Sequence, residues 1–427
     1  MPKIETRPIF FPALSQEFSK IYEKTDKDLF GSSVNVVKNP RFYNDCKNYF
    51  YHPYTLWNAH EHILFQKIKN IRKEKRIDNK CLVMLDSGGF QLGKGSTENK
   101  KYNKEIVLKW SESNGDIFPI IDYPLMDEYN RTFEENLKFS VENGEYYKKN
   151  RTKKGVMILN VLQGRNFDES DEWYDRIKHL NKGVGALDGW AIGGVSDNPL
   201  MFIYTIRKLY KDGHFNKKKQ SWIHIFGTTS FESMLYLSVI QKNLNKLCNV
   251  QISYDSATLS HTTKYGNFME HRPNLSRFVR GELASGTVLY SDLCESIDRF
   301  RHIFLSKHFD YKFVKKDTKL PLPFSPIVSE ITDAKEFCKN RKTYTLLGNL
   351  HNLWMMIQQK ELFDNLVFWG DERVINESIG NELKINVNVI NQIFTKKELK
   401  KKYTMKCGNI LEMFSSYYSH YNDKRKI

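Results

Sequence analysis

The residues that could do chemistry in this chain stand at the ends of short apolar runs, at nearly regular intervals. Two of them are Asp86 in LDSGGFQ and Asp255 in YDSAT. Such a pair of carboxylates can divide a reaction between a nucleophile and a general acid and base. A simpler interpretation of Asp86 is a buried residue that caps the next helix. The whole series is Asp86, Asp122, Gln163, Gly194, Gly227 and Asp255, at intervals of 36, 41, 31, 33 and 28 residues.

Strands and helices must position these residues, and the apolar pattern indicates where those elements lie. Strand-like runs occur at 81–87, 116–122, 155–164, 189–194, 222–227 and 249–255. Helix-like segments separate them at 103–114, 131–149, 169–181, 199–211 and 230–244. Each interval in the series therefore corresponds to one strand and one crossover helix.

Parallel strands with crossover helices form either a closed barrel or an open, doubly wound sheet. In a barrel the carboxyl ends of all strands open on one face, so residues that are distant in sequence converge there. An open sheet usually carries a glycine-rich phosphate loop after its first strand. The chain has no such loop. We therefore predict an α/β protein with a (β/α)8 TIM barrel.

The alternation of strand-like and helix-like segments ends at about residue 280, and helical patterns follow at 289–306, 345–359 and 396–418. We predict that residues 1–285 form the barrel core with the catalytic face. Residues 286–427 then supply the last barrel elements and a helical C-terminal appendage. The length of 427 residues suits a barrel of roughly 250 residues with one small addition.

The charge balance favours a polyanionic partner. The chain has 66 Lys and Arg against 50 Asp and Glu, a formal net charge of +16. Such a surplus is typical of proteins that bind nucleic acid, although a solvated lysine-rich surface would give the same balance. Much of it lies in runs at 67–76, 148–154 and 217–220 and in the C-terminal tail, and these runs could follow phosphates.

Cysteines and apolar stretches indicate the compartment. The six cysteines lie far apart, without a CxxC pair and without a secretory leader before them. We therefore expect reduced thiols and a cytoplasmic protein. The longest apolar stretches, such as CLVML, are shorter than the roughly 20 residues of a membrane helix, so we expect no membrane partner.

The motif LDSGGFQ as a whole resembles the DSGG(F/Y)Q signature of the tRNA-guanine transglycosylase family. Further matches follow in the family's order: VLQG at 161–164, GWAIGGV at 189–195, HIFGTTSFESM at 224–234, YDSAT at 254–258 and LHNLW at 350–354. The resemblance covers roughly residues 80 to 355. It implies a pentosyltransferase that exchanges guanine in a nucleic acid for another base.

The resemblance implies a role for each carboxylate. Asp255 matches the nucleophile that attacks C1′ of the sugar and expels guanine, and Asp86 matches the general acid and base. An oxocarbenium-like transition state suits such a pair, because one carboxylate bonds to the sugar while the other handles the proton of the base nitrogen. A covalent glycosyl-enzyme then accepts a free 7-deazaguanine base as co-substrate, and the chemistry requires no cofactor.

The resemblance also implies a base-binding set. Asp122 matches the residue that reads the N1 and N2 donors of the purine, while Gln163 and the backbone of Gly194 match groups that address O6. Phe90 matches an aromatic residue that stacks on the base. The alternatives are a helix cap for Asp122, a rim hydrogen bond for Gln163 and a core position for Phe90. The remaining members of the expected set are Ser87, Gly88, Gly193 and Gly227.

Two features depart from the tRNA-acting members of the family. Those members carry a CxCxxC zinc site with a later histidine, whereas only Cys338 and His351 stand in that region here. Two ligands do not make a structural zinc site, so bound zinc is doubtful. The nucleophile segment continues as SATLSHTTKYGN and lacks the family's arginines, which leaves His261 and Lys264 as candidates for nucleic-acid contacts.

These departures favour the DpdA branch of the family, which exchanges guanine for a 7-deazaguanine in bacterial and phage DNA. The lysine- and asparagine-rich composition also fits a phage-encoded protein that acts in a host cytoplasm. A guanine in duplex DNA would have to be flipped out of the stack to reach the site. A homodimer or helper proteins would be compatible with this reading.

Two alternatives stay open. One is the same reaction on tRNA, as in queuine or archaeosine modification. The other is a noncatalytic nucleic-acid-binding subunit, against which the retention of both Asp86 and Asp255 argues.

Overall fold

The main feature of the fold is a nearly closed barrel of parallel strands. The computed structural model describes residues 2–14, 41–44, 51–93, 102–126, 131–194, 199–228, 230–256, 268–269, 287–288, 334–379 and 381–395. Eight of the described strands form one sheet in the order β1-β8-β7-β6-β5-β4-β3-β2. They are β1 (Ile9–Pro12), β2 (Tyr54–Asn58), β3 (Leu82–Asp86), β4 (Ile117–Pro119), β5 (Met157–Leu162), β6 (Gly189–Ile192), β7 (Ser221–Ile225) and β8 (Val250–Ser256).

The two ends of this sheet meet and bring the barrel close to full closure. A parallel bridge joins Ala13, directly after β1, to Leu56 of β2, and the Leu14 amide donates to the Leu56 carbonyl at 3.3 Å. On its other side β1 pairs in parallel with β8, with Phe11 opposite Asp255. The predicted (β/α)8 barrel is therefore confirmed. The six predicted strands correspond to β3 to β8, whereas β1 and β2 were not predicted.

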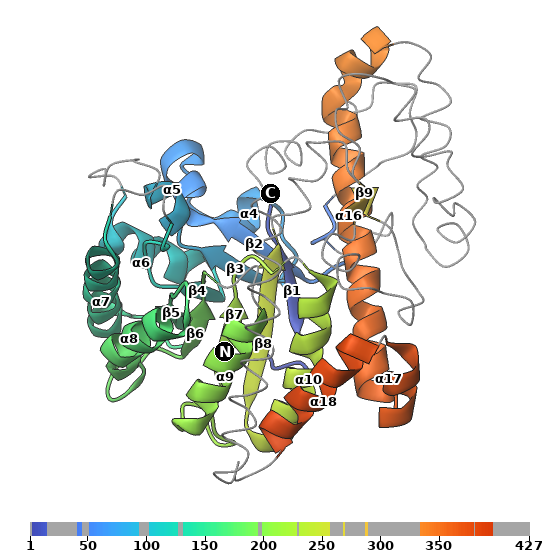
Figure 1. The fold of residues 1–427 in the computed structure, drawn as a ribbon. Helices are drawn as coiled ribbons and strands as arrows, with labels where there is room; N and C mark the ends of the chain where they lie inside the picture. The colour runs from blue at the N-terminus through green and yellow to red at the C-terminus, as the bar shows by residue number, and fades with distance from the viewer. Residues whose placement is uncertain are drawn as a thin grey trace.

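Helices alternate with the strands and cover the outside of the barrel (Figure 1). The long crossover helices are α6 (Lys104–Asn114), α7 (Phe133–Asn150), α8 (Phe167–Ile177), α9 (Pro199–Lys211) and α10 (Phe231–Leu247). Their positions agree with the five helical segments predicted from the sequence. Shorter elements are α3 (Ala59–Glu61), α4 (Ile71–Glu74), α5 (Gly89–Gly93), the π-helix η1 (His62–Gln66) and the 3-10 helix η2 (Lys178–Asn181).

Capping residues set where the crossover helices begin. Asn103, Asn166 and Ser230 each accept a hydrogen bond from a backbone amide in the first turn of α6, α8 and α10. Helix α7 begins with a capping box, in which Thr132 accepts from the Glu135 amide and the Glu135 carboxylate accepts from the Thr132 amide. Because these bonds satisfy amides that lack a partner within the helix, they fix the first residue of each crossover.

The core fills the barrel and the layer between strands and helices. Every residue of β5, β6, β7 and β8 is buried. Trp57, Trp190 and Trp222 are among the largest fully buried side chains. Each large apolar side chain removed from water stabilises the fold by about 1.5–3 kcal/mol. A rigid interior of this kind can hold the strand ends in fixed positions.

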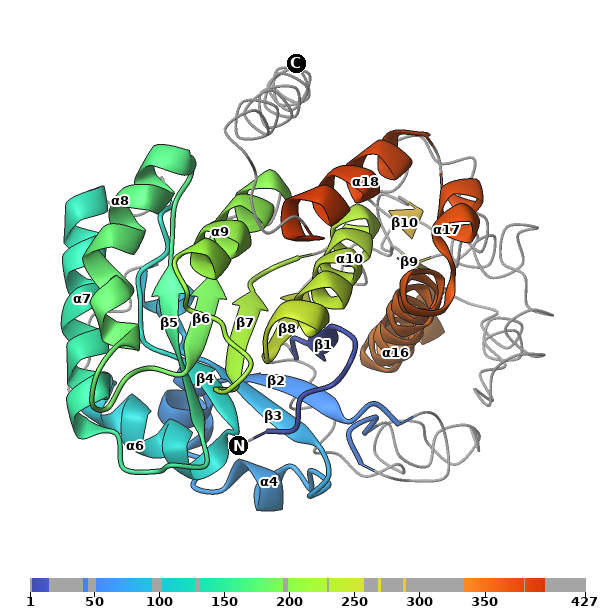
Figure 2. The same ribbon diagram turned by 90° about the horizontal axis from the view of Figure 1, so that it is seen from below.

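In the part of the C-terminal region that the structure describes, three helices form the predicted helical appendage: α16 (Ala334–Trp369), α17 (Glu372–Ser378) and α18 (Asn381–Thr395). Helix α16 packs against α10 beside β1, on the outside of the barrel (Figure 2). Ser238 of α10 donates to the Asp364 carboxylate of α16 at 2.7 Å. Helix α18 lies against α9 and α10.

The predicted helix at 345–359 falls within α16, whereas those at 289–306 and 396–418 lie outside the described residues. The predicted boundary between residues 285 and 286 lies outside them too. Strands β9 (Phe268–Met269) and β10 (Thr287–Val288) form a separate antiparallel pair. Among the helices that the structure describes, none combines the length and the apolar character that crossing a membrane requires.

Candidate active site

Asp86 is the last residue of β3 and the first of the carboxylates at the barrel mouth. Its Oδ2 accepts a hydrogen bond from Asn58 Nδ2 at 2.7 Å, and its Oδ1 accepts one from the Gly88 amide at 3.1 Å. Burial raises the pKa of Asp86, the nearby charge of Asp255 acts in the same direction, and both hydrogen bonds oppose the rise. Asp86 can therefore gain and release a proton more readily near neutrality than an exposed aspartate.

The loop after Asp86 places the rest of the LDSGGFQ motif. Ser87 is buried, and its carbonyl accepts a hydrogen bond from the Tyr102 hydroxyl. Gly88 packs against His60. Phe90 lies on α5 and is 40% exposed. This exposure excludes the core position considered for Phe90.

Asp255 lies near the end of β8 and is held through one of its oxygens. Its Oδ1 accepts a hydrogen bond from the Gly227 amide at 2.9 Å and lies 3.2 Å from His224 Nε2. Gly227 has a φ of 66°, in the left-handed region that suits glycine. The turn after β7 thus directs a backbone N–H at the carboxylate and holds its Oδ1 in a fixed position.

Asp122 and Gln163 form a second polar pair at the mouth, after β4 and β5. Gln163 Nε2 donates to Asp122 Oδ2 at 2.7 Å. Burial raises the pKa of Asp122 to about 7; the Gln163 contact opposes this rise and the charge of Asp86 contributes to it. A Cβ on Gly193 would lie 2.4 Å from Gln163 Nε2, so any larger residue there would displace the Gln163 side chain. The neighbouring Gly194 is exposed.

Gln163 Oε1 is buried and has no hydrogen-bond partner among the described residues. A buried acceptor without a donor is costly, and such groups mark places where a ligand or water completes the structure. Asp122 Oδ1 lies close by, because a Cβ added to Gly89 would meet it at 3.2 Å. The pair therefore offers acceptor atoms to a ligand with neighbouring N–H groups.

The three aspartates influence one another across the mouth of the barrel. The charge of Asp255 acts on Asp86, and that of Asp86 acts on Asp122. They come from the ends of β8 and β3 and from the segment after β4, so the barrel brings together residues that are far apart in sequence. The structure thus places Asp86, Asp122, Gln163, Gly193, Gly227 and Asp255 in one region.

The sequence did not indicate two residues that contact these carboxylates, Asn58 and His224. Asn58 ends β2, and it stands 28 residues before Asp86, an interval like those of the predicted series. His224 is a polar residue inside the apolar strand β7. The interval between Asn58 and Asp86 and the histidine within an apolar strand are both visible in the sequence. Neither indicates a site residue by itself, because short strands and single histidines are common for simpler reasons.

The remaining predicted site residues are not placed by the structure. His261 and Lys264 lie outside the described residues. Cys338 and His351 fall within α16, but their side chains are outside the described part. Among the described side chains, no group of three or more His, Cys, Asp or Glu is arranged to hold a metal ion.

The basic runs at 148–154 and 217–220 lie at the opposite end of the barrel. They directly precede β5 and β7, so they stand where strands begin, whereas the aspartates stand where strands end. Arg151 pairs with Asp188 at 2.9 Å and donates to the carbonyls of Ala186 and Val156. Lys148 donates to two further carbonyls. Part of this charge therefore holds segments of the barrel together.

The run at 67–76 is also tied to the strand-start end. Arg72 pairs with Asp116 at 2.5 Å and donates to the Cys81 carbonyl at 3.0 Å, directly before β3 and β4. The Lys69 carbonyl accepts from Asn114, at the C-terminal end of α6. All three runs therefore lie at the end of the barrel away from the aspartates, and that they follow phosphates stays a prediction.

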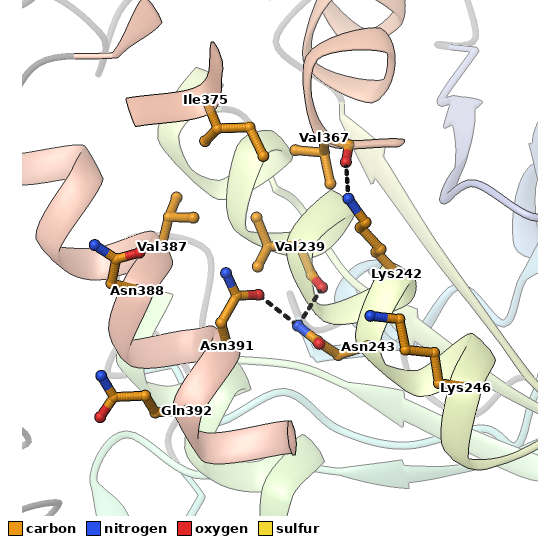
Figure 3. Close-up of a pocket in the computed structure, with 10 residues that line it drawn as sticks. All are labelled: Val239, Lys242, Asn243, Lys246, Val367, Ile375, Val387, Asn388, Asn391 and Gln392. Atoms are coloured by element: carbon orange, nitrogen blue, oxygen red, sulfur yellow. Dashed lines mark hydrogen bonds between the residues drawn. The ribbon is translucent and has the colours of Figure 1, made fainter. Parts of the chain in front are cut away.

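A cavity of about 540 Å³ lies away from the aspartates, between α10 and the C-terminal helices (Figure 3). Asn243 of α10 donates to Asn391 of α18 at 2.8 Å across it. Its lining has four aliphatic side chains, two lysines and four amides: Val239, Val367, Ile375, Val387, Lys242, Lys246, Asn243, Asn388, Asn391 and Gln392. Because no carboxylate lines it, this cavity cannot perform the acid and base chemistry available at the mouth.

Comparison with known proteins adds no identification. No known protein family matches the chain, and no curated protein is similar to it at a significant level.

Proposed function

We propose that this protein is a base-exchanging transglycosylase that replaces guanine in DNA with a 7-deazaguanine base. The observation that carries the proposal is the pairing of two carboxyl groups in unlike surroundings. Asp86 is buried with a raised pKa, while Asp255 is held through its Oδ1 by the Gly227 amide and His224. Two acids with divided roles are what the breaking and remaking of a glycosidic bond require.

The first half of the reaction removes guanine. Asp255 attacks C1′ of the deoxyribose, the bond between C1′ and the base nitrogen breaks, and an ester joins Asp255 to the sugar. Asp86 gives its proton to the departing nitrogen. The raised pKa of Asp86 suits this step, because a carboxyl group that holds its proton near neutrality can act as a general acid.

The second half reverses these steps with another base. The ionised Asp86 takes the proton from the nitrogen of the incoming 7-deazaguanine. That nitrogen attacks C1′, the ester bond breaks, and Asp255 leaves as a carboxylate. Atoms and charges balance over the cycle, and no cofactor enters it.

Asp122 and Gln163 supply the recognition of the base. The carboxylate of Asp122 is an acceptor that matches the N1 and N2 donors of guanine, and the amide group of Gln163 beside it is the expected partner of O6. Guanine and its 7-deaza analogues share that edge, so one pocket can serve both. Phe90, which is 40% exposed, is the aromatic side chain that we expect to stack on the flat base.

We propose DNA rather than tRNA as the substrate because the sequence lacks two features of the tRNA-acting enzymes. The chain has neither the zinc cysteines nor the arginines after the nucleophile that accompany tRNA substrates in the family it resembles. The net charge of +16 suits either polymer. Within duplex DNA the target guanine has to leave the stack before Asp255 can reach C1′.

An exchange assay tests the proposal. The full chain is incubated with labelled guanine and either duplex DNA or tRNA, with Asp255→Asn as the matched control. We expect label in DNA that depends on Asp255. Label in tRNA alone would contradict the choice of polymer. Retention of nucleic acid without any exchange would support a noncatalytic subunit. Mass spectrometry of nucleosides from cells that express the chain then identifies the inserted base.

A further inference from the structure

Four side chains form a hydrogen-bonded series inside the barrel below the mouth. Trp222 Nε1 lies 2.7 Å from Ser253 Oγ, Ser253 Oγ lies 2.9 Å from His224 Nδ1, and His224 Nε2 lies 3.2 Å from Asp255 Oδ1. Trp222, His224 and Ser253 are each 0% exposed. The series comes from two neighbouring strands, β7 and β8, in which His224 and Ser253 are paired. It does not involve the solvent.

The chemistry of these groups allows one continuous direction for the hydrogen bonds, in which each group donates to the next. An indole N–H can only donate, so Ser253 Oγ accepts from Trp222. The serine hydroxyl then has its own proton to give, and His224 Nδ1 is the acceptor within reach. An imidazole that accepts at Nδ1 carries its proton at Nε2 when it is neutral. His224 therefore donates from Nε2 to Asp255.

The same contacts distinguish the two oxygens of Asp255. Both the Gly227 amide and His224 bind Oδ1. None of the described residues donates to Oδ2, which leaves this oxygen with a free lone pair.

We propose that His224 is a positioning residue for the nucleophile. Ser253 and Trp222 hold it as the neutral Nε2–H tautomer, and Asp255 Oδ2 is the oxygen that attacks C1′. This inference rests on the proposed function, since it assigns how Asp255 performs its part of that reaction.

A neutral donor suits a nucleophile better than a cation does. A protonated imidazole would form an ion pair with Asp255 and withdraw negative charge from the attacking oxygen. The neutral ring orients the carboxylate and leaves its charge available. When Oδ2 forms the ester, Oδ1 becomes the carbonyl oxygen and keeps the hydrogen bonds from Gly227 and His224. No proton has to move through His224 in either half of the reaction.

The test compares His224→Phe, His224→Gln and a control, His214→Phe, in the full chain. His214 packs against Trp190 at 5.0 Å between ring centroids, near the end of the barrel where the strands begin. We expect His224→Phe to slow formation of the covalent adduct by about 10- to 100-fold, because it removes one hydrogen bond to a charged group. The KM for the free base should not change. Glutamine carries an amide N–H near the position of Nε2 and should restore most of the rate.

An adduct that forms at the wild-type rate in folded His224→Phe would overturn the positioning role. Should that variant fail to fold, Ser253→Ala replaces it, since it keeps the imidazole but removes the partner of Nδ1. We expect a loss of about 3- to 10-fold for Ser253→Ala. A wild-type rate in this variant would show that the series does not influence the nucleophile.

Nitrogen NMR of protein labelled at its histidines tests the tautomer without any need for activity. The His224 signals are those missing from His224→Gln, and we expect an unprotonated Nδ1 and a protonated Nε2. A proton on Nδ1 would overturn the inference. Failure of the wild type to exchange base on either polymer would instead reject the proposed function. Exchange by the wild type with full activity of His224→Phe rejects only the role of His224.

Discussion

The acids at the two ends of the barrel have different partners. Where the strands begin, acids are paired with arginines: Asp116 with Arg72 at 2.5 Å and Asp188 with Arg151 at 2.9 Å. Where the strands end, no described arginine or lysine pairs with Asp86, Asp122 or Asp255, and burial raises the pKa of the first two. Burial also raises the pKa of Asp116, but there Arg72 opposes the rise, whereas no described arginine or lysine opposes it at Asp86 or Asp122.

This difference separates stability from reactivity. A paired acid at the strand-start end contributes to holding the barrel together, whereas a buried acid without a cation weakens the fold and is available for chemistry. Changes at the mouth should therefore remove activity and preserve or increase stability. Changes at the other end should do the reverse. The expected effects range from a loss of several orders of magnitude in exchange rate to almost no change in DNA affinity.

The largest effect is expected for Asp255→Asn. An amide cannot form the ester with C1′, so exchange should fall by about 10⁴-fold or more. Denaturing electrophoresis of protein mixed with labelled DNA should show no adduct. The midpoint of thermal unfolding should stay near that of the wild type. Exchange at the wild-type rate would show that Asp255 is not the nucleophile.

Asp122→Asn should make the protein more stable at alkaline pH. Because the pKa of Asp122 is raised from 3.8 to about 7 in the folded protein, the wild type loses stability as the pH rises between these values. The asparagine variant lacks this loss, so its advantage grows to at most about 4 kcal/mol above neutrality. Urea unfolding at about pH 5 and about pH 8 measures the difference. An equal effect at both values would contradict the assigned environment.

The same variant should bind guanine less well. Ionised Asp122 accepts from the N–H donors of the base, so wild-type affinity should rise with pH through about 7, the pKa of the unoccupied site. Asp122→Asn should lower the affinity by about 10- to 100-fold above neutrality and flatten the pH profile. Calorimetric titration with guanine checks both effects, and an unchanged profile would exclude Asp122 from base binding.

At the other end, Arg151→Met should destabilise the fold without affecting the chemistry. It breaks the ion pair with Asp188 and two hydrogen bonds to carbonyls, at a cost of about 1–3 kcal/mol. The initial rate of exchange at 25 °C should match that of the wild type. A slower rate in fully folded protein would show that the two ends are coupled.

The smallest effect is expected from replacing Lys149, Lys153 and Lys154 together by glutamine. These side chains are exposed and stand at the end of the barrel opposite the aspartates. We expect DNA affinity to change by no more than about twofold and its salt dependence to keep its slope. A shallower slope would mean that the polymer extends over both ends of the barrel.

Much of the fold could be predicted, because its strongest signals are local. Apolar runs such as MILNVL of β5 and helices such as α9 have the lengths and periods of a crossover unit. Strands β1 and β2 were missed, since IFFP and YTLWN are short and are not followed by a clear crossover pattern. The barrel needs them to close, but closure is a property of the whole chain.

The site was predictable only in part, for a related reason. The intervals between Asp86, Asp122 and Asp255 indicated that they converge. The contacts from Asn58 and His224 depend on which strands are neighbours and on which side chains point inward, and single residues do not reveal this. The places of the basic runs could have been inferred, since each of the runs at 148–154 and 217–220 ends shortly before a strand.

The pairing of β1 with β8 also affects how the protein forms on the ribosome. Phe11, opposite Asp255, is made near the start of synthesis, and about 240 residues follow before its partner exists. At roughly 5–20 residues per second this interval lasts roughly 10 to 50 s. During that time β1 has no partner on this side, and its apolar residues are exposed to association with other chains. Asp255 therefore acquires its final neighbours only after nearly all of the barrel has been synthesised, and a chain that stops before β8 lacks this carboxylate altogether.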